Sequence, residues 1–285
     1  MLTAETGIKV LYDVADASWK PDDKAVCNIV VSAGHVVMTV FDPSKKRFVS
    51  LYCAEIHPDN EKFTLIAARL ADNYSGIHKQ RIFISLPKTM LIPLALFDRE
   101  NRDHFLEKQH KAEAGDLASD YPVKLIDAQM AFLYPKAWEQ LKNNVIGANL
   151  IFIPLDSAWL DGLYLNYKNN DETHLHLNIN DGFISVAVFR DGALQFYNTF
   201  DTANAEEVLY FVMFVSEQLH VNANKDSYFY SGFIKKTDET FTFLSKYIKN
   251  IKPEERPGFY NYSMPILDVP IHMFFNAFCT PICES

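Results

Sequence analysis

Residues 179–189, Ile-Asn-Asp-Gly-Phe-Ile-Ser-Val-Ala-Val-Phe, match residues 31–41, Val-Ser-Ala-Gly-His-Val-Val-Met-Thr-Val-Phe, at an offset of 148 positions. Several aligned positions hold similar apolar residues. The identical pairs are Gly34 with Gly182, Val40 with Val188, and Phe41 with Phe189. Because internal repeats reveal architecture, this match predicts a chain of two related halves, residues 1–150 and residues 151–285.

The elements around the match follow one order in both halves. In the second half, apolar periodicity and the hairpin signals Asp181-Gly182 and Asp191-Gly192 predict three strands, a helix and a returning strand. Their ranges are 173–180, 183–190, 193–200, 203–219 and 227–232. The corresponding ranges of the first half are 25–32, 35–42, 47–55, 60–73 and 81–86. We therefore predict an α/β fold in which each half is a mixed sheet with flanking helices.

Segments outside the repeated unit add further elements. The sequence predicts strands at 89–97, 123–132 and 149–154, and helices at 99–114, 136–143, 237–251 and 269–278. The last of these helices is apolar around much of its circumference. We interpret it as closing the core of the second half, with docking of a protein partner as the alternative.

The duplicated order of strand, strand, strand, helix and strand resembles the actin-like ATPase superfamily, which includes actin, sugar kinases, chaperone ATPases and bacterial division and pilus-assembly proteins. Residues 178–185 stand where that superfamily usually has Asp-x-Gly-Gly-Gly-Thr-Thr-Asp, and Arg190-Asp191-Gly192 matches a later turn of the type Arg-Asp-Gly. Residues 230–233, Tyr-Ser-Gly-Phe, stand at a Ser-Gly-Gly-Gly motif that packs on adenosine. The chain resembles an uncharacterised bacterial family of actin-like proteins, which implies two ribonuclease H-like halves with a cleft between them.

The resemblance also implies where a ligand would bind. In the superfamily, the hairpin turn between the first two strands of each half holds phosphate, and the fourth strand of the second half contacts adenosine. The positions of this chain that match these places form a candidate nucleotide or ligand cleft: Ser32, Gly34, Asn178, Asn180, Gly182, Ser231 and Gly232. A divergent ATP-binding switch, or a weak ATPase that uses Mg-ATP in this cleft, is one hypothesis for the function.

Departures from the superfamily pattern argue against catalysis. Val30 and Asn178 stand where the superfamily has the two aspartates that organise the metal and the attacking water. Valine cannot bind magnesium, and asparagine offers an oxygen without charge. Asp181 would face a triphosphate and repel it. These features argue against phosphoryl transfer, so we assign no catalytic residue, metal or cofactor.

The glycines that remain in this region have a simpler explanation. Gly34 and Gly182 are typical of tight hairpin turns, with or without a phosphate. The whole chain has ten glycines, which leaves few places for a phosphate-binding loop. In addition, a cleft filled by side chains such as His35, Phe183 and Phe233 would argue against a nucleotide.

Composition and charge exclude several other classes of protein. The 285 residues are 48% hydrophobic, which is too apolar for a disordered chain. The formal net charge of −9 disfavours binding to nucleic acid or to acidic membranes. No run of about 18 uncharged apolar residues predicts a membrane span. The first residues lack a cationic region followed by an apolar run, so we expect no signal peptide and a cytoplasmic location.

Cysteine and histidine spacing does not predict a metal site. Cys27 and Cys53 lie in apolar runs that are typical of buried reduced thiols, and Cys279 and Cys283 have no second pair at zinc-binding spacing. His174 and His176 alternate on one face of a predicted strand, which suits either a metal or two ordinary strand histidines, but no third ligand is identifiable. We therefore hypothesise a non-catalytic binding or scaffold protein with an unknown protein partner, and the nucleotide switch is the alternative.

Overall fold

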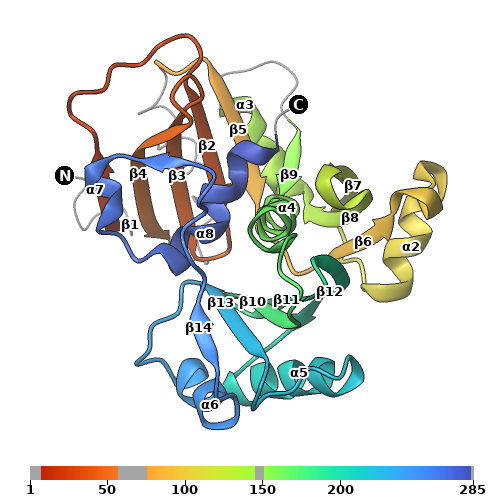
Figure 1. The fold of residues 1–285 in the computed structure, drawn as a ribbon. Coiled ribbons are helices and arrows are strands. Elements are labelled where there is room, and N and C mark those ends of the chain that lie inside the picture. The colour runs from red at the N-terminus through yellow and green to blue at the C-terminus, as the bar shows by residue number, and fades with distance from the viewer. Residues whose placement is uncertain (1–7, 57–75, 145–150, 284–285) are drawn as a thin grey trace.

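The computed structural model describes residues 8–56, 76–144 and 151–283. These residues form three sheets with helices between and around them (Figure 1). The helix predicted at 60–73 lies outside the described residues. No helix in the described part of the chain has the length and apolarity that crossing a membrane requires.

The first sheet contains the strands of the first half and two segments from later in the chain. In the described residues its order is β1-β4-β3-β2-β5-β9, with β15 paired to β4. The bounds are β1 Ile8–Ala15, β2 Val26–Val31, β3 His35–Asp42, β4 Arg47–Ile56, β5 Lys79–Ile84, β9 Phe152–Pro154 and β15 Asn261–Tyr262. Every side chain of β2 is buried, as expected for a central strand that is covered on both faces.

The second sheet repeats the order of the first. Its strands lie in the order β12-β11-β10-β13-β14. The bounds are β10 His174–Asn180, β11 Phe183–Arg190, β12 Ala193–Asp201, β13 Ser227–Gly232 and β14 Ile251–Pro253. In both sheets the first two strands of the repeat are antiparallel, and the returning strand, β5 or β13, is parallel to the first. The chain is therefore an α/β fold of two similar halves.

The offset of 148 positions holds for three of the four strand pairs of the repeat, whereas β4 and β12 begin 146 positions apart. The first residues of β2, β3 and β5 lie 148 positions before those of β10, β11 and β13. The irregularity between Val40 and Phe41 recurs between Val188 and Phe189, where each middle strand meets its next neighbour. A bulge at the same place bends both sheets in the same way.

A three-stranded sheet lies beside these two within the described residues and contains β6, β8 and β7 in that order. The bounds are β6 Thr89–Pro93, β7 Asp116–Val123 and β8 Ala128–Pro135, with helices α2 Arg102–Gln109 and α3 Glu139–Asn144 following β6 and β8. The strand predicted at 123–132 begins too early, because a short turn ending at Asp127, whose φ is +49°, separates β7 from β8, and only residues 128–132 of the prediction lie in β8. The helix predicted at 99–114 is also too long, since it ends at Gln109.

Helix α4, Leu155–Tyr167, crosses the centre of the molecule, and the sequence prediction missed it (Figure 1). Its first nine residues are all buried. A helix that is buried on every side lacks the one-sided apolar period by which helices are recognised. Gly162 lets it approach helix α8, Ile271–Cys279, because a Cβ atom at that position would lie 2.3 Å from the sulfur of Cys279.

The C-terminal segment returns to the first half of the chain. Strand β15 pairs with β4, and helix α7, Met264–Leu267, packs near β1. Helix α8 packs on α4, on β13 and on β3, and Phe274, Phe275 and Phe278 belong to the core cluster of the first sheet. The helix predicted at 269–278 is therefore a core element, which was the preferred interpretation over docking of a partner. However, it lies between the halves and not in the core of the second half. The boundary between residues 1–150 and 151–285 stays a prediction.

Helices α5, Ala205–Gln218, and α6, Glu239–Tyr247, cover the other face of the second sheet. Strand β11 contributes to both faces: Val186 and Val188 lie in the core under α5 and α6, whereas Ala187 and Phe189 belong to the core shared with α4. This alternation is the period of two expected for a strand. The second sheet is thus enclosed between α4 and α8 on one side and α5 and α6 on the other.

A buried carboxylate on α4 should make stability depend on pH. Asp161 is 3% exposed and accepts a hydrogen bond of 3.0 Å from the backbone N–H of Leu125. Burial raises its pKa from 3.8 to about 6, so the folded state binds the proton more tightly than the unfolded state. The stabilisation is complete below about pH 4 and is lost as the pH rises through 6.

We predict that wild type loses about 2–3 kcal/mol of unfolding free energy relative to Asp161→Asn between pH 4 and pH 7. The asparagine keeps the acceptor for Leu125 but does not titrate. Urea denaturation of both proteins at several pH values measures the difference. Parallel curves for the two proteins would contradict the prediction.

Candidate functional site

The two hairpin turns that the sequence singles out meet in the structure. Gly34 follows β2, and Asp181 and Gly182 follow β10. The Oδ2 atom of Asp181 lies 2.5 Å from the position that a Cβ atom at residue 34 would occupy. The same atom is 3.8 Å from Nδ1 of His35. The hairpins therefore face each other across the cleft, and the Asp181 side chain lies between them.

The space between the hairpins is nearly filled. Ser32, Asn178, Asn180 and Gly232 line a cavity of about 30 Å³, and Val30 lines it as well. Helices α4 and α8 contribute Leu155, Met273, Asn276 and Ala277 to its walls, and the rest of the lining is His35, Val37, Ser85 and Phe233. A cavity of this size holds about one water molecule. Four of the residues predicted from the sequence therefore lie around one cavity, and that cavity is far smaller than a nucleotide.

The other three predicted residues do not line this cavity. Ser231 is buried and donates a hydrogen bond of 3.2 Å to the carbonyl of Leu177. Gly34 and Gly182 form the hairpin turns next to the cavity. Four of the seven candidate residues therefore contact the cavity directly, and three support the backbone around it.

An aromatic pair closes the cleft. The rings of His35 and Phe233 are stacked, with centroids 3.9 Å apart and planes inclined by 2°. Phe233 also meets Phe274 of α8 edge to face. Burial lowers the pKa of His35, so its imidazole is neutral near pH 7 despite the nearby carboxylate of Asp181. Phe183, the third side chain expected to fill the cleft, is buried but is not among the residues that line it.

A second cavity lies on the outer side of this pair. It has a volume of about 210 Å³, and its lining includes Ser32, His35, Asp181 and Asp238. The described residues that line the two cavities include no lysine or arginine. A phosphate group in the outer cavity would therefore meet the carboxylates of Asp181 and Asp238 with no lysine or arginine among the described lining residues.

Two of the glycines here are required by the backbone. Gly232 has a φ of +108°, and a Cβ atom there would lie 2.0 Å from the carbonyl oxygen of Ile179. Gly182 has a φ of +81°, but a Cβ atom there would meet open space. Both angles are unfavourable for other residues. The need for glycine at these positions is therefore explained by the fold, without a ligand.

Asp156, which sequence reasoning missed, places a carboxylate directly beside Asn178. Its Oδ2 atom accepts hydrogen bonds of 2.6 Å from Ser185 and from the hydroxyl of Tyr197, and its Oδ1 atom accepts one of 3.2 Å from the Asn178 amide. Burial raises the pKa of Asp156, although these three donors oppose the rise. Asp156 is 3% exposed, and both of its carboxylate oxygens accept hydrogen bonds. It joins the start of α4 to the second sheet.

His174 and His176 lie on one strand face, as predicted, and form a buried hydrogen-bonded chain. Nδ1 of His174 lies 2.6 Å from Nε2 of His176, and Nδ1 of His176 lies 2.5 Å from Oε1 of Glu254. The hydroxyl of Tyr167 donates to the other oxygen of Glu254 at 3.1 Å. Burial, together with the neighbouring His176, lowers the pKa of His174 to about 3. The chain connects β10 with α4 and with the segment after β14.

Metal-binding clusters are absent from the described part of the chain, where no three His, Cys, Asp or Glu side chains gather suitably. The four cysteines are free and buried. The burial predicted for Cys27 and Cys53 is therefore confirmed.

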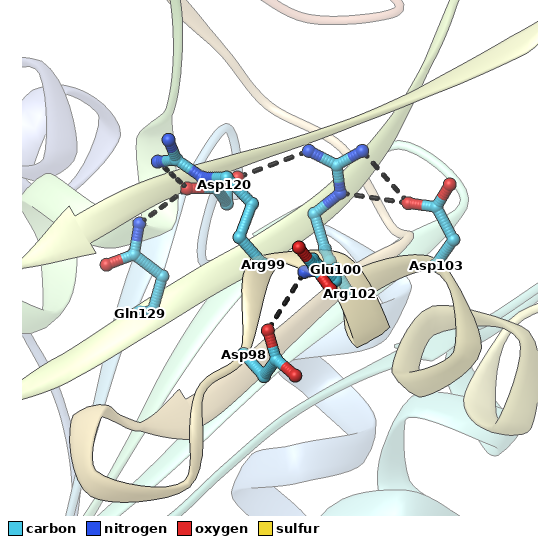
Figure 2. Close-up of polar contacts among 7 residues, drawn as sticks. All are labelled: Asp98, Arg99, Glu100, Arg102, Asp103, Asp120 and Gln129. Carbon is cyan, nitrogen blue, oxygen red and sulfur yellow. Dashed lines mark hydrogen bonds and ion pairs between the residues drawn. The ribbon is translucent and has the colours of Figure 1, made fainter.

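A separate polar cluster fixes the three-stranded sheet, outside the cleft (Figure 2). The Asp120 carboxylate accepts hydrogen bonds from Arg99 at 2.9 Å, Arg102 at 3.2 Å and Gln129 at 2.8 Å. Burial raises the pKa of Asp120, but these donors outweigh burial and hold the pKa below its usual value. Arg102 also pairs with Asp103. The cluster ties the start of α2 to β7 and β8, and its charges are largely balanced.

Comparisons with known proteins agree with this architecture. A family model described as protein of unknown function (DUF3822) matches residues 22–251. No curated protein matches the chain. A Bacteroides thetaiotaomicron protein with an actin-like ATPase fold and unknown function aligns with a TM-score of 0.76 at 15% identity, over 92% of this chain and 97% of that chain.

A second solved structure, the PilM–PilN type IV pilus biogenesis complex, contains a chain that aligns with a TM-score of 0.63 at 12% identity. The alignment covers 91% of this chain and 99% of that chain. At such identities the likeness shows the fold alone. The chain therefore has an actin-like ATPase fold, as the resemblance implied.

The structural roles of the two glycines can be compared by substitution. We predict that Gly232→Ala lowers the unfolding free energy by about 3 kcal/mol or more, because the unfavourable φ and the collision with Ile179 add together. Gly182→Ala should lower the unfolding free energy by only about 1 kcal/mol, because residue 182 has an unfavourable φ but no collision at the Cβ position. Urea denaturation of both variants tests the difference, and equal losses would contradict it.

Proposed function

The chain belongs to the DUF3822 family of proteins of unknown function, and we propose that it is a non-catalytic binding or scaffold protein built on an actin-like frame. The observation that carries this proposal is the closed cleft between the hairpins. Binding pockets for small molecules usually enclose about 300–1,000 Å³. The cavity among the predicted ligand residues encloses about 30 Å³, and its neighbour about 210 Å³.

The charges in the cleft also support a protein that does not bind nucleotides. A triphosphate would approach Asp181 and Asp238, and His35 is neutral near pH 7 because burial lowers its pKa. Enzymes that transfer phosphoryl groups place cations and a metal at this position. Val30 lines the cavity where the superfamily has an aspartate, and it cannot bind magnesium.

The nearby carboxylate does not replace the missing aspartates. Asp156 is buried, and its oxygens accept hydrogen bonds from Ser185, Tyr197 and Asn178. A general base must lie within hydrogen-bond reach of the substrate, and Asp156 is only 3% exposed. Asp156 instead stabilises the closed arrangement, because it joins α4 to the second sheet directly behind the cleft.

A protein partner is the remaining part of the proposal. The PilM–PilN structure is a complex, so the same fold occurs in at least one protein assembly. A scaffold role requires a stable frame and an exposed binding surface, and neither depends on a nucleotide. We place this role in the cytoplasm, in keeping with the four free, buried cysteines, because thiols stay reduced in that compartment.

We predict that Mg-ATP does not raise the melting temperature of the protein. A ligand that binds only the folded state at 100 times its dissociation constant stabilises it by about 2.7 kcal/mol. In a chain of 285 residues, whose unfolding entropy is roughly 0.6 kcal/mol/K, that corresponds to a shift of roughly 4–5 °C. The measurement compares thermal unfolding in about 5 mM Mg-ATP with thermal unfolding in magnesium alone. This concentration is 100 times the dissociation constant of a ligand that binds with a Kd of about 50 μM.

The control variant is Ser32→Trp. Ser32 lines both cavities, so a tryptophan there would fill them, and the substitution leaves the glycines that the fold requires unchanged. A shift in wild type that disappears in Ser32→Trp would place the nucleotide in the cleft and overturn the proposal in favour of an ATP-dependent switch. An unchanged melting temperature in both proteins supports the scaffold function.

A further inference from the structure

Helix α5 carries more apolar side chains than its position in the fold uses. Val208, Val212 and Val215 face the second sheet and are buried. The opposite side carries Tyr210 and Phe214, which are 62% and 44% exposed and whose rings are stacked on each other. A surface helix normally has one apolar face and one polar face. The outward aromatic face therefore lacks a covering element in the described structure.

This face forms one wall of a groove between α5 and α6, which we call the α5–α6 groove. Leu209, Tyr210, Met213 and Phe214 line one side of the groove, and Phe243 and Tyr247 line the other. Its volume is about 770 Å³, within the usual range of binding pockets. Figure 1 shows both helices on the outer side of the second sheet, away from the first sheet.

The charges at the groove are unequal on its two sides. Glu206 and Glu217 line it from opposite ends of α5, are exposed, and have no ion-pair partner among the described residues. Eleven positions separate them, about 16 Å along a helix. On the other side, the ammonium of Lys246 lies 4.9 Å from the centre of the Phe243 ring. The α5 side is therefore acidic, and the α6 side carries a cation.

We infer that the α5–α6 groove binds an amphipathic helix of a protein partner, with lysine or arginine residues along the edge that faces α5. An apolar groove between two helices accepts the apolar face of a third, with contacts at positions i, i+3, i+4 and i+7. Two basic residues about eleven positions apart would reach Glu206 and Glu217 together. The exposed aromatic residues Tyr210 and Phe214 would supply most of the binding energy, as aromatic side chains do at interfaces.

A second copy of the chain fits the groove less well. In a two-fold dimer the same patch meets itself, so Glu206 and Glu217 would approach the same two carboxylates. The net charge of −9 adds to the repulsion between copies. A basic partner helix satisfies both the apolar surface and the unpaired charges.

The inference rests on the binding role proposed above and names the surface that performs it. The test uses the full-length protein and a displayed library of 18-residue amphipathic helices, present in equal numbers of basic and acidic versions. We expect basic helices to be enriched on wild type. On Glu206→Lys/Glu217→Lys, which reverses two exposed unpaired charges, acidic helices should be enriched instead.

Two aspartate substitutions identify the surface. Phe214→Asp should weaken the selected peptides at least about tenfold in fluorescence anisotropy. Met264→Asp changes another exposed apolar residue, at the start of α7, and should bind like wild type. Circular dichroism confirms that each variant is folded.

Three results would overturn the inference. The first is that wild type enriches no more helices than Phe214→Asp does, and the second is that basic and acidic helices are enriched equally on wild type and on Glu206→Lys/Glu217→Lys. The third is a wild-type dimer in sedimentation velocity that Phe214→Asp dissociates. Selection is run with and without Mg-ATP. Because nucleotide binding is measured separately by thermal unfolding, a nucleotide shift with intact helix binding would refute only the proposed absence of nucleotide binding. If wild type binds no helix and Mg-ATP causes no shift in melting temperature, only the inference that the α5–α6 groove binds a partner helix is refuted.

Discussion

The close packing of α4 against α8 is the constraint on which the closed cleft depends. Gly162 has no side chain, so the two helices approach until the sulfur of Cys279 lies 2.3 Å from the position that a Cβ atom of residue 162 would take. Helix α8 then fills the space between the halves, where Phe274 supports Phe233, and Phe233 stacks on His35. Protein interiors are packed as densely as organic crystals, so this contact holds the two hairpins close together.

Buried polar groups hold the same arrangement from the second sheet. Asp156 joins α4 to β10, β11 and β12, and Glu254 joins Tyr167 of α4 to His176 of β10. Removing one partner of such a group leaves the other buried without a hydrogen bond, which is costly. These contacts therefore favour one relative position of α4 and the second sheet. A frame of this kind suits a binding protein whose partner contacts an outer surface, such as the α5–α6 groove.

The strands and their order could be predicted from the sequence because their signals are local. Asp181-Gly182 and Asp191-Gly192 mark hairpins, and the match of residues 31–41 with 179–189 carried the same order into the first half. Helix α4 could not be predicted in this way, since burial on all sides removes its apolar period. Asp156, which lies on that helix, was missed for the same reason, and no signal within its own segment indicates its partners.

The sequence alone determined an α/β chain of two similar halves and its resemblance to an actin-like frame, and it led to the prediction that Val30 and Asn178 replace the metal-binding aspartates of that frame. Only the tertiary structure decided that α8 lies between the halves, that His35 and Phe233 close the cleft, and that α5 leaves an aromatic face uncovered. The physical reason is the sequence separation of the residues that interact. Turns and strand periods depend on neighbouring residues, whereas a cavity depends on side chains that the chain brings together from distant positions.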